Sequence, residues 1–327
     1  MTTLSAYSPY SGPHVHDTAW WVALASSLGL DRVWFGQQSS VSLLGGVGYA
    51  AGRGHRVQLG SAVTLMPTTT PFTSALDLRS LAQLSDSTVA AYFSPGYPAI
   101  QHALGGRAWT SPLTATRQFF AGLRGLLAGG DIHEPGDYYS TTFDSPADDI
   151  SDRVELGLGV LRPAMARLAG EIADGAVTWL SSPEYLRAVL VPALDAGADV
   201  AARPRPRVVA TLHAGIGVSP SDSVEVVRRG VGPHLSAPHY RDMLRRDGLD
   251  LTGPPTDRDI ADVIDRRLFV LGGPEAVLDR AAELVDAGAD EVSIVLHQPG
   301  GATRDDIRST WTELAAHVHR FEEGKAA

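Results

Sequence analysis

The sequence predicts an eight-stranded α/β barrel, a TIM barrel with loop insertions, that forms one domain over residues 1–327. The first observation is a motif, x-x-Gly-x-Asp-x-Val, that occurs at residues 27–33 and again at 286–292. In each copy a helix can end at a glycine with positive φ, and a buried strand can begin shortly afterwards. Strands and helices alternate between the two copies, which is typical of a parallel barrel of the usual size for one domain.

The second observation is the segment 158–186, which has the pattern of one βα step. Pro163 suits the first turn of a helix, because its missing N–H costs nothing there. The helix can end at 174–175, residues 176–180 form a short apolar strand, and Ser181 or Ser182 can cap the next helix. Two helix N-termini therefore face the same strand ends, and their free N–H groups suit a phosphate.

Local periodicity places the other elements in order. Strands are expected at 4–8, 32–35, 57–63, 88–93, 153–158, 176–180, 207–213 and 291–296. Helices are expected at 17–28, 41–52, 72–84, 113–127, from 163 to 174, from 183, within 220–267 with breaks at Gly232-Pro233 and 253–255, from 274, and at 304–322. Residues 94–112 are expected to be a Gly/Pro-rich loop, and turn residues at 129–146 indicate a hairpin or loop insertion.

Composition excludes several classes of protein. The chain is 44% hydrophobic and 20% charged, and no apolar run reaches the ~18 residues of a membrane span. The net charge of −10 disfavours binding to nucleic acid or to an anionic membrane. The chain has no cysteine and does not open with a basic and then apolar leader, so we expect a cytoplasmic protein. Lys325 is the one lysine among 27 basic residues, a bias typical of a G+C-rich, actinobacterial genome.

Four segments together resemble the bacterial-luciferase-like superfamily: residues 29–37 (GLDRVWFGQ), 56–96, 161–186 and 271–296 (beginning LGGPEAV). The resemblance implies a barrel oxidoreductase that uses either FMN or the deazaflavin coenzyme F420. The segment RLAGEIADGAVTW is more similar to the F420 branch. We therefore expect hydride transfer between F420 and a small organic substrate. The alternatives are an FMN-dependent monooxygenase and a non-catalytic flavin-binding barrel.

The resemblance also implies where the cofactor binds. Its ring would lie against a bulge and a non-prolyl cis peptide in the third strand, which here would be the bond between Ala62 and Val63. Its phosphate would be held by groups that follow the fifth and sixth barrel strands. The expected cofactor-binding residues are Ser61, Ala62, Val63, Leu161, Arg162, Trp179, Ser181 and Ser182.

The residue at the position where the family pattern has a proton donor differs in this chain. Many relatives place an acidic residue or a histidine after the second strand, where this chain has Gln37. Glutamine can orient a substrate but cannot act as an acid or base at neutral pH. His14 is the first candidate for the missing acid or base, although a surface histidine that caps the following helix is the competing interpretation. The other candidates are Tyr10 and His16 in the same loop, Tyr97 and His102 after the fourth strand, and His297 after the last.

Two other motifs are weak evidence for a functional site. The glycine-rich run at 46–52 imitates a dinucleotide fingerprint, but its spacing is wrong and no strand precedes it. His14-x-His16 could begin a metal site, yet no third ligand has a recognisable spacing, so no metal is expected. We expect a small-molecule or peptide substrate, for example an unsaturated intermediate of natural-product assembly. By resemblance, the second and third helices pair two subunits into a homodimer.

Overall fold

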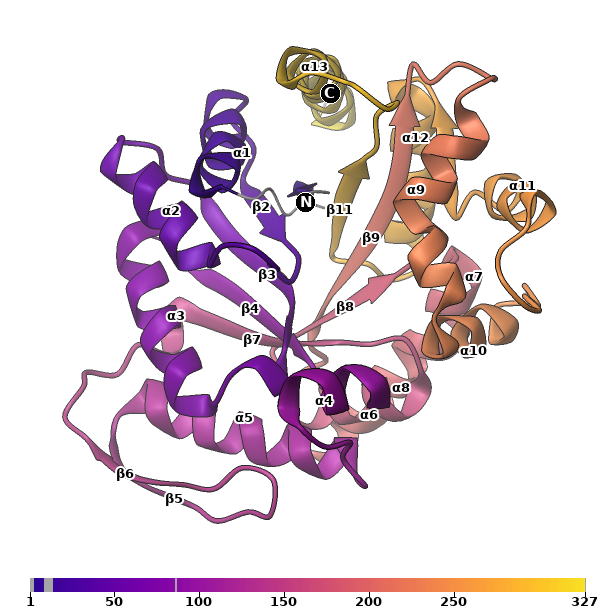
Figure 1. Cartoon of the computed structure of the whole chain (residues 1–327). Coiled ribbons are helices and arrows are strands. Elements are labelled where there is room, and N and C mark those ends of the chain that lie inside the picture. The colour runs from indigo at the N-terminus through magenta and orange to yellow at the C-terminus, as the bar shows by residue number, and fades with distance from the viewer. Residues whose placement is uncertain (1–2, 9–13, 86, 327) are drawn as a thin grey trace.

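The computed structural model describes residues 3–8, 14–85 and 87–326. Eight parallel strands close into a barrel, because β8 pairs with β9 and β11 pairs with β1 (Figure 1). Around the barrel the order is β1 (Thr3–Ser8), β2 (Arg32–Phe35), β3 (Gln58–Leu65), β4 (Val89–Ser94), β7 (Val154–Gly159), β8 (Gly175–Trp179), β9 (Arg207–Ile216) and β11 (Glu291–Leu296). The predicted barrel is confirmed, with each of its eight strands near the expected position.

Helices surround the barrel, and the expected start signals hold at α6 and α7. Arg162 is the N-cap of α6 and Ser182 that of α7, each followed by proline. The helices between barrel strands include α1 (Val15–Ser27), α2 (Leu43–Gly52), α3 (Pro71–Ser85), α5 (Pro112–Ala128), α6 (Pro163–Ile172), α7 (Pro183–Tyr185), α8 (Val191–Val200), α9 (Ser223–Ser236) and α12 (Pro274–Asp286). A π-helical turn at Leu186–Leu190 joins α7 to α8. The last helix is α13 (Arg304–Ala326). The run at 46–52 lies within α2, so it is not a strand-to-helix phosphate loop.

The repeated motif works as expected at both ends of the chain. Gly29 follows α1 with φ of +66°, and Gly288 follows α12 with φ of +110°. A positive φ lets the chain leave the helix sharply, and β2 and β11 begin within three residues. The two strands flank β1 on either side, so the motif places both neighbours of the first strand.

Three local expectations are wrong. The stretch expected to be a loop at 94–112 contains α4 (Pro98–Gly105), which begins at a proline that suits a first helical turn. A further strand, β10 (Phe269–Gly272), pairs with the end of β9 outside the barrel. The break expected at Gly232-Pro233 is absent, because α9 runs through Pro233. Proline removes one helical hydrogen bond, and the burial of neighbouring residues such as Leu235 outweighs that loss.

Insertions extend from the ends of the barrel. The expected hairpin is confirmed as the antiparallel pair β5 (Gly130–Glu134) and β6 (Thr141–Ser145), which lies beyond α5 at the periphery (Figure 1). After α9 the chain forms α10 (Pro238–Arg246) and α11 (Asp257–Asp265). Short 3-10 turns lie at Met66–Thr68 and Ser151–Arg153. Among the residues described, no helix has the length and apolar content that a membrane span requires.

The hydrophobic core has two parts. The larger lies between the barrel and its helices, and the smaller fills the barrel. Side chains alternate along each strand, so every second residue points inward. Gly60 allows tight interior packing, because a Cβ there would lie 2.2 Å from the Trp34 ring. The interior cluster comprises Tyr7, Trp34, Ala62, Ala90, Tyr92, Val177, Val209 and Val295, with Val63 and Trp179 packed against it.

Charged groups close the amino-terminal end of the barrel. The Glu291 carboxylate is 1% exposed and accepts hydrogen bonds from Trp34 Nε1 (2.6 Å), Ser5 (2.5 Å) and Arg32 (3.0 Å). Arg207 also pairs with Glu291 and bridges to Glu155. Burial alone would raise the pKa of Glu291, but the charges of Arg32 and Arg207 outweigh burial and lower it. This network is at the end of a barrel that serves stability, not catalysis.

Candidate active site

Four rings meet inside the carboxyl end of the barrel, where active sites of such barrels lie. Tyr7 is the last residue but one of β1, Trp179 ends β8, His213 lies in β9, and His297 directly follows β11. Trp179 contacts Tyr7 and His213 with ring centroids 5.1 and 4.6 Å apart. Cross-strand register places Val295 beside both Tyr7 and His213, so these residues form one layer. We call Tyr7, Trp179, His213 and His297 the mouth cluster.

The cis peptide expected in the third strand is present between Ala62 and Val63. The pairing of β3 with β4 shifts between Ala62 and Thr64, which is the expected bulge. The Tyr7 hydroxyl donates a hydrogen bond of 2.5 Å to the carbonyl oxygen of Ala62, so the mouth cluster is joined to the bulge. Burial and nearby Tyr240 raise the pKa of Tyr7 far above its ordinary value, so the hydroxyl remains a donor. Ser61 lies next to this bond and pairs with Phe35 of β2.

Gln37, which follows β2, holds the segment of β3 just beyond the bulge. Its side-chain oxygen accepts a hydrogen bond of 2.9 Å from the backbone N–H of Leu65, just beyond the bulge. Its amide nitrogen donates to the carbonyl of Gln38. The residue at the position where the resemblance implied an acid or base is therefore engaged here in holding β3. A catalytic role for Gln37 stays a prediction.

Two histidines of the mouth cluster form a pair. His213 Nδ1 and His297 Nε2 lie 2.9 Å apart, and the rings are stacked at 5.2 Å. His213 is fully buried and His297 is 7% exposed. Burial, together with His297 and His234, lowers the pKa of His213 well below its ordinary value. Burial and the charge of Arg229 lower the pKa of His297 to about 3, so both rings are neutral at pH 7.

A second histidine group covers the mouth cluster. His234 of α9 packs on Trp179 with centroids 5.3 Å apart, and on Tyr240 of α10. His239 of α10 stacks on Tyr97, which immediately precedes α4, at 5.0 Å. Burial lowers the pKa of His234 and of His239 to about 4. Elements that follow β4 and β9 thus meet over the mouth of the barrel.

The remaining acid or base candidates lie elsewhere. His14 is exposed at the N-cap of α1, and its backbone N–H donates to the Asp17 carboxylate at 3.1 Å. His16 is exposed and packs on Tyr49. His102 is exposed in the last turn of α4, and Tyr10 lies outside the described residues. Of all the histidine candidates from the sequence, the structure places His297 in the mouth cluster; roles for His14 and His102 stay predictions.

The residues expected to bind the cofactor phosphate lie at the starts of α6 and α7. Arg162 has an exposed side chain whose Nη1 lies 3.6 Å from Asp242. The carbonyl of Leu161 accepts a hydrogen bond from Tyr185, and Ser181 bonds to Thr178. These contacts leave the Arg162 guanidinium within reach of solvent, where a phosphate could bind it.

Ser182 has a partner that the sequence did not indicate. Its backbone N–H and its hydroxyl both donate to the Asp247 carboxylate, at 3.1 and 2.5 Å. Asp247 is the C-cap of α10, so an acidic group of the chain lies where the sequence suggested a phosphate. Burial raises the pKa of Asp247 despite its hydrogen bonds to Ser182. A cofactor phosphate next to Ser182 would face this carboxylate.

Sequence reasoning missed His213, His234, His239 and Asp247. One signal was present for His213, because the expected strand 207–213 ended on it, at the catalytic end of a barrel strand. The other three lie in the helical region after β9, where neither spacing nor type marked them. Their partners are distant in sequence; His213 and His297 are 84 residues apart.

The buried polar atoms of the mouth indicate a ligand. Within the described residues, Trp179 Nε1, His213 Nε2, His234 Nδ1 and His239 Nδ1 are buried and lack a hydrogen-bond partner. Such atoms normally have a partner, so these fit a bound molecule or water.

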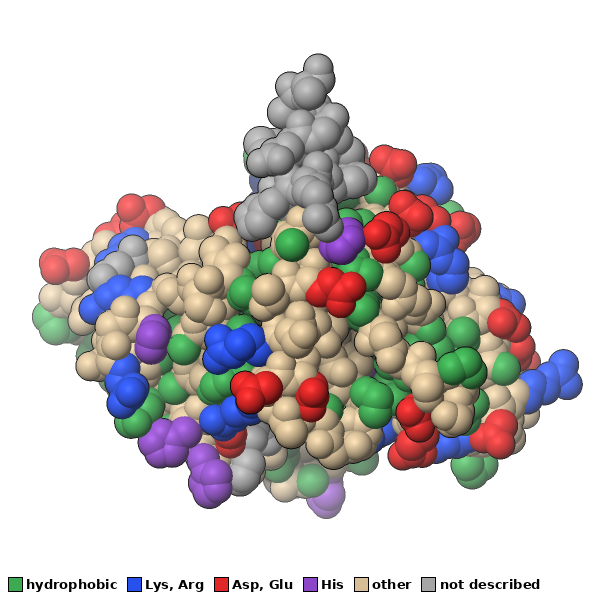
Figure 2. Space-filling view, turned by 90° about the horizontal axis from the view of Figure 1, so that it is seen from above, with side chains coloured by type: hydrophobic (Ala, Val, Ile, Leu, Met, Phe, Trp, Pro, Cys, Tyr) green, Lys and Arg blue, Asp and Glu red, His purple; other side chains and the backbone are tan. Residues whose placement is uncertain are grey.

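No group of three or more metal-ligating side chains occurs in the described part of the chain. On the face in Figure 2, acidic and basic side chains are interspersed, without a continuous basic surface.

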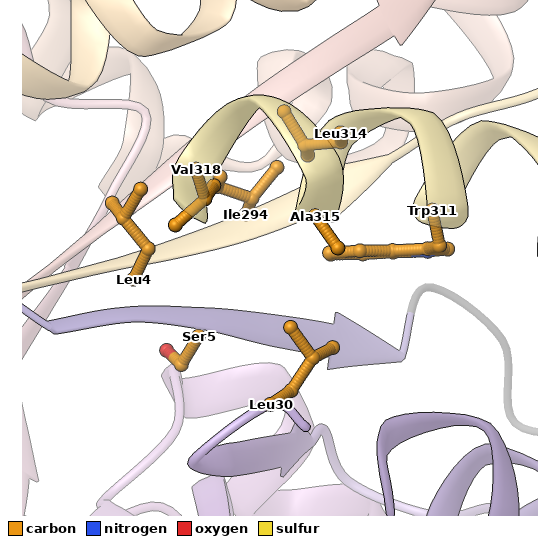
Figure 3. Close-up of a pocket in the computed structure, with 8 residues that line it drawn as sticks. All are labelled: Leu4, Ser5, Leu30, Ile294, Trp311, Leu314, Ala315 and Val318. Carbon is orange, nitrogen blue, oxygen red and sulfur yellow. The ribbon is translucent and has the colours of Figure 1, made fainter. Parts of the chain in front are cut away.

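A separate cavity lies away from this site, between α13 and the barrel strands. Its volume of about 20 Å³ suffices for roughly one water molecule (Figure 3). Its lining is largely apolar and includes Leu4, Leu30, Ile294, Trp311, Leu314 and Val318. At this volume it is too small to bind a substrate.

Comparison with known proteins gives the family. The chain is 26% identical over 306 residues to the 5,10-methylenetetrahydromethanopterin reductase of Methanolobus tindarius, covering 88% of this chain and 91% of that one. The structure of the coenzyme F420-dependent tetrahydromethanopterin reductase from Methanopyrus kandleri superposes with a TM-score of 0.77 at 22% identity, covering 97% and 99% of the two chains.

An FMN-binding enzyme has the same fold. The oxygenating constituent of 3,6-diketocamphane monooxygenase from Pseudomonas putida, in complex with FMN, superposes with a TM-score of 0.73 at 14% identity and covers 96% of each chain. The family model described as luciferase-like monooxygenase matches residues 1–291. The chain therefore belongs to the luciferase-like monooxygenase family.

Proposed function

We propose that the protein is a coenzyme F420-dependent oxidoreductase, which transfers a hydride between the deazaflavin and a small organic substrate. The observation that carries this proposal is the match over 88% of the chain to a 5,10-methylenetetrahydromethanopterin reductase, together with the likeness to the Methanopyrus kandleri tetrahydromethanopterin reductase, which is described as coenzyme F420-dependent. Bound F420 would supply the hydride donor or acceptor, and the protein would bind and orient the reactants.

The residues of the site fit such a cofactor. Arg162 has an exposed guanidinium at the start of α6, which can bind a phosphate through two N–H groups. Val63 and Trp179 line the carboxyl end of the barrel, where a planar ring could pack between apolar surfaces. The proposed ring contacts are Ser61, Ala62, Val63 and Trp179, and the proposed phosphate contacts are Leu161, Arg162, Ser181 and Ser182.

The test is a fluorescence titration of the purified protein with F420 and, separately, with FMN. We expect saturable F420 binding that is at least tenfold tighter than FMN binding. Submicromolar FMN binding with no F420 binding would replace the proposal by the FMN-dependent monooxygenase. Binding of either cofactor without turnover of any substrate would favour a non-catalytic barrel.

We further propose a cytoplasmic homodimer that pairs through α2 and α3. Tyr49 of α2 and Phe72 and Leu76 of α3 are 38%, 45% and 51% exposed, and Phe143 of the hairpin packs on Phe72. Large apolar side chains left exposed on two helices that contact each other are typical of an interface. Sedimentation should show a dimer that Leu76→Glu dissociates, whereas Val200→Glu, at a more exposed apolar site on α8, should not.

A further inference from the structure

Oxidation or reduction at a carbon–oxygen bond by hydride transfer also needs a proton to leave or reach the oxygen. Gln37 cannot supply it, and its side chain is engaged with Leu65. The group that exchanges this proton must therefore come from another part of the mouth. The following inference rests on the proposed function.

His213 and His297 have the geometry of a two-step proton path. One hydrogen bond of 2.9 Å joins His213 Nδ1 to His297 Nε2, so each ring keeps a second nitrogen for another partner. For His213 this is Nε2, which is buried and has no partner among the described residues. We propose that His213 and His297 form a proton relay, in which His213 Nε2 exchanges a proton with the substrate oxygen and His297 conducts it toward solvent.

The direction of the relay follows from exposure. His213 is fully buried within the barrel, whereas His297 lies after the end of β11 and is 7% exposed. His234 and Arg229 of α9 are the charged or titratable neighbours that lower the pKa of His297. Because both rings of the pair are neutral, each can accept a proton at one nitrogen while it releases one from the other.

The substrate oxygen has a second contact available. The Trp179 ring lies 4.6 Å from the His213 ring, and its Nε1 is also buried without a partner. An indole N–H is a donor only, whereas His213 Nε2 can accept or donate. One hydroxyl or carbonyl oxygen within hydrogen-bond distance of both atoms would satisfy both nitrogens. None of the mouth cluster residues carries a formal charge at pH 7, so the cluster suits an uncharged alcohol or ketone better than a phosphate or carboxylate.

The step balances in the oxidising direction. The substrate carbon loses a hydride, with its two electrons, to oxidised deazaflavin, and the O–H proton moves to His213 Nε2. The C–H and O–H bonds break and the C=O double bond forms. The proton on His213 Nδ1 then passes to His297 Nε2, and His297 releases its Nδ1 proton to water. Both histidines end neutral, and reduction of a ketone runs through the same positions in reverse.

The first test observes the histidines without any cofactor. Histidine-selective ¹⁵N NMR at pH 7 should show both rings neutral, with the proton of His213 on Nδ1. His297→Gln should shift the His213 Nδ1 resonance, and His102→Gln, which changes an exposed ring of α4 away from the pair, should leave it in place. A protonated ring at pH 7, or a His213 resonance that ignores His297→Gln, would overturn the relay.

The second test measures oxidation of 2-propanol and cyclohexanol, with glucose 6-phosphate as the charged comparison. His213→Gln should lower kcat by about 10²-fold or more, and added imidazole should restore part of the rate in His213→Ala. A kcat within threefold of wild type in His213→Gln would refute the relay. The proposed function would still stand in that case, because F420 binding would be unaffected. Turnover of glucose 6-phosphate alone, or of neither alcohol by protein that binds F420, would refute the substrate class. Absent F420 binding would instead reject the proposed function.

Discussion

The hydroxyl of Tyr7 donates a hydrogen bond of 2.5 Å to the carbonyl oxygen of Ala62, so the end of β1 is joined to the bulge of β3 across the barrel interior. Tyr7 also packs edge-on against Trp179. A single side chain therefore fixes the proposed wall behind the cofactor ring relative to the indole at the end of β8.

Tyr7→Phe should weaken both folding and cofactor binding. The variant keeps the ring but leaves a buried carbonyl without a partner, which costs about 1–3 kcal/mol in the free energy of unfolding. Urea unfolding and fluorescence titration with F420 measure the two effects. Tyr92→Phe is the matched control, because it removes a buried hydroxyl that bonds to Glu155 at the opposite end of the barrel. Equal F420 affinity in the two variants would argue that the Tyr7–Ala62 hydrogen bond does not support the cofactor ring.

Asp247→Asn should tighten binding of a phosphate-bearing cofactor. Asp247 accepts hydrogen bonds from the N–H and hydroxyl of Ser182, and its negative charge would repel a phosphate there. Removing the charge is worth about 1 kcal/mol, or roughly fivefold in Kd. Arg162→Gln should act in the opposite direction, weakening Kd by ~10-fold or more, since it removes a charged donor.

A deazaflavin that lacks the phosphate separates this effect from a general disturbance of the site. Its Kd should be the same in wild type, Asp247→Asn and Arg162→Gln. If Asp247→Asn leaves F420 binding unchanged while Arg162→Gln weakens it, the phosphate lies at the start of α6 alone and Ser182 serves to anchor α10.

The contrast between Gly29 and Asp247 shows which features a single sequence can predict. Gly29 and Gly288 end helices through their own φ, a local property, and so the alternating elements of the barrel could be predicted. The Ala62–Val63 bond was placed by resemblance, which carries information from other chains. Ser182 and Asp247 are 65 residues apart, and their contact depends on how α10 folds back over the mouth. No local pattern specifies that path.

Missed elements have a similar cause. β10 is four residues long and pairs with the end of β9, so neither its length nor its periodicity separates it from a loop. Pro233 is a helix breaker in isolation, and only the burial of the surrounding turn keeps α9 continuous. His213 was assigned to a strand correctly, but its importance depends on His297, which a different strand supplies.

Glu291→Gln should cost stability without affecting the active site. The carboxylate is buried and pairs with Arg32 and Arg207. Arg207 keeps its ion pair with Glu155, but neutralising Glu291 leaves the buried charge of Arg32 without its carboxylate, at a cost of about 3–5 kcal/mol. Thermal and urea unfolding should show the loss, and the Kd for F420 at 15 °C should stay within twofold of wild type. A large change in Kd in folded protein would mean that the base of the barrel influences the mouth.

Stability should fall as the pH decreases from about 6.5 toward 4. The pKa is lowered to about 3 for His297 and to about 4 for His234, and well below the ordinary value for His213. Below an ordinary histidine pKa of about 6.5 the unfolded chain therefore binds protons that the folded chain does not. The stabilisation from neutral burial is complete above that pH, and each such histidine removes about 1.4 kcal/mol per pH unit below it.

The contribution of one ring can be isolated from the slope of the free energy of unfolding against pH, measured by urea unfolding between pH 7 and 4.5. His297→Gln lowers stability at pH 7, because His213 Nδ1 loses its partner, but it should reduce the slope by about 1.4 kcal/mol per pH unit near pH 5. His102→Gln, which changes an exposed ring of α4, is the matched control. An unchanged slope in His297→Gln would show that this ring already takes up a proton in the folded protein, a state in which the stacked pair with His213 could not remain neutral.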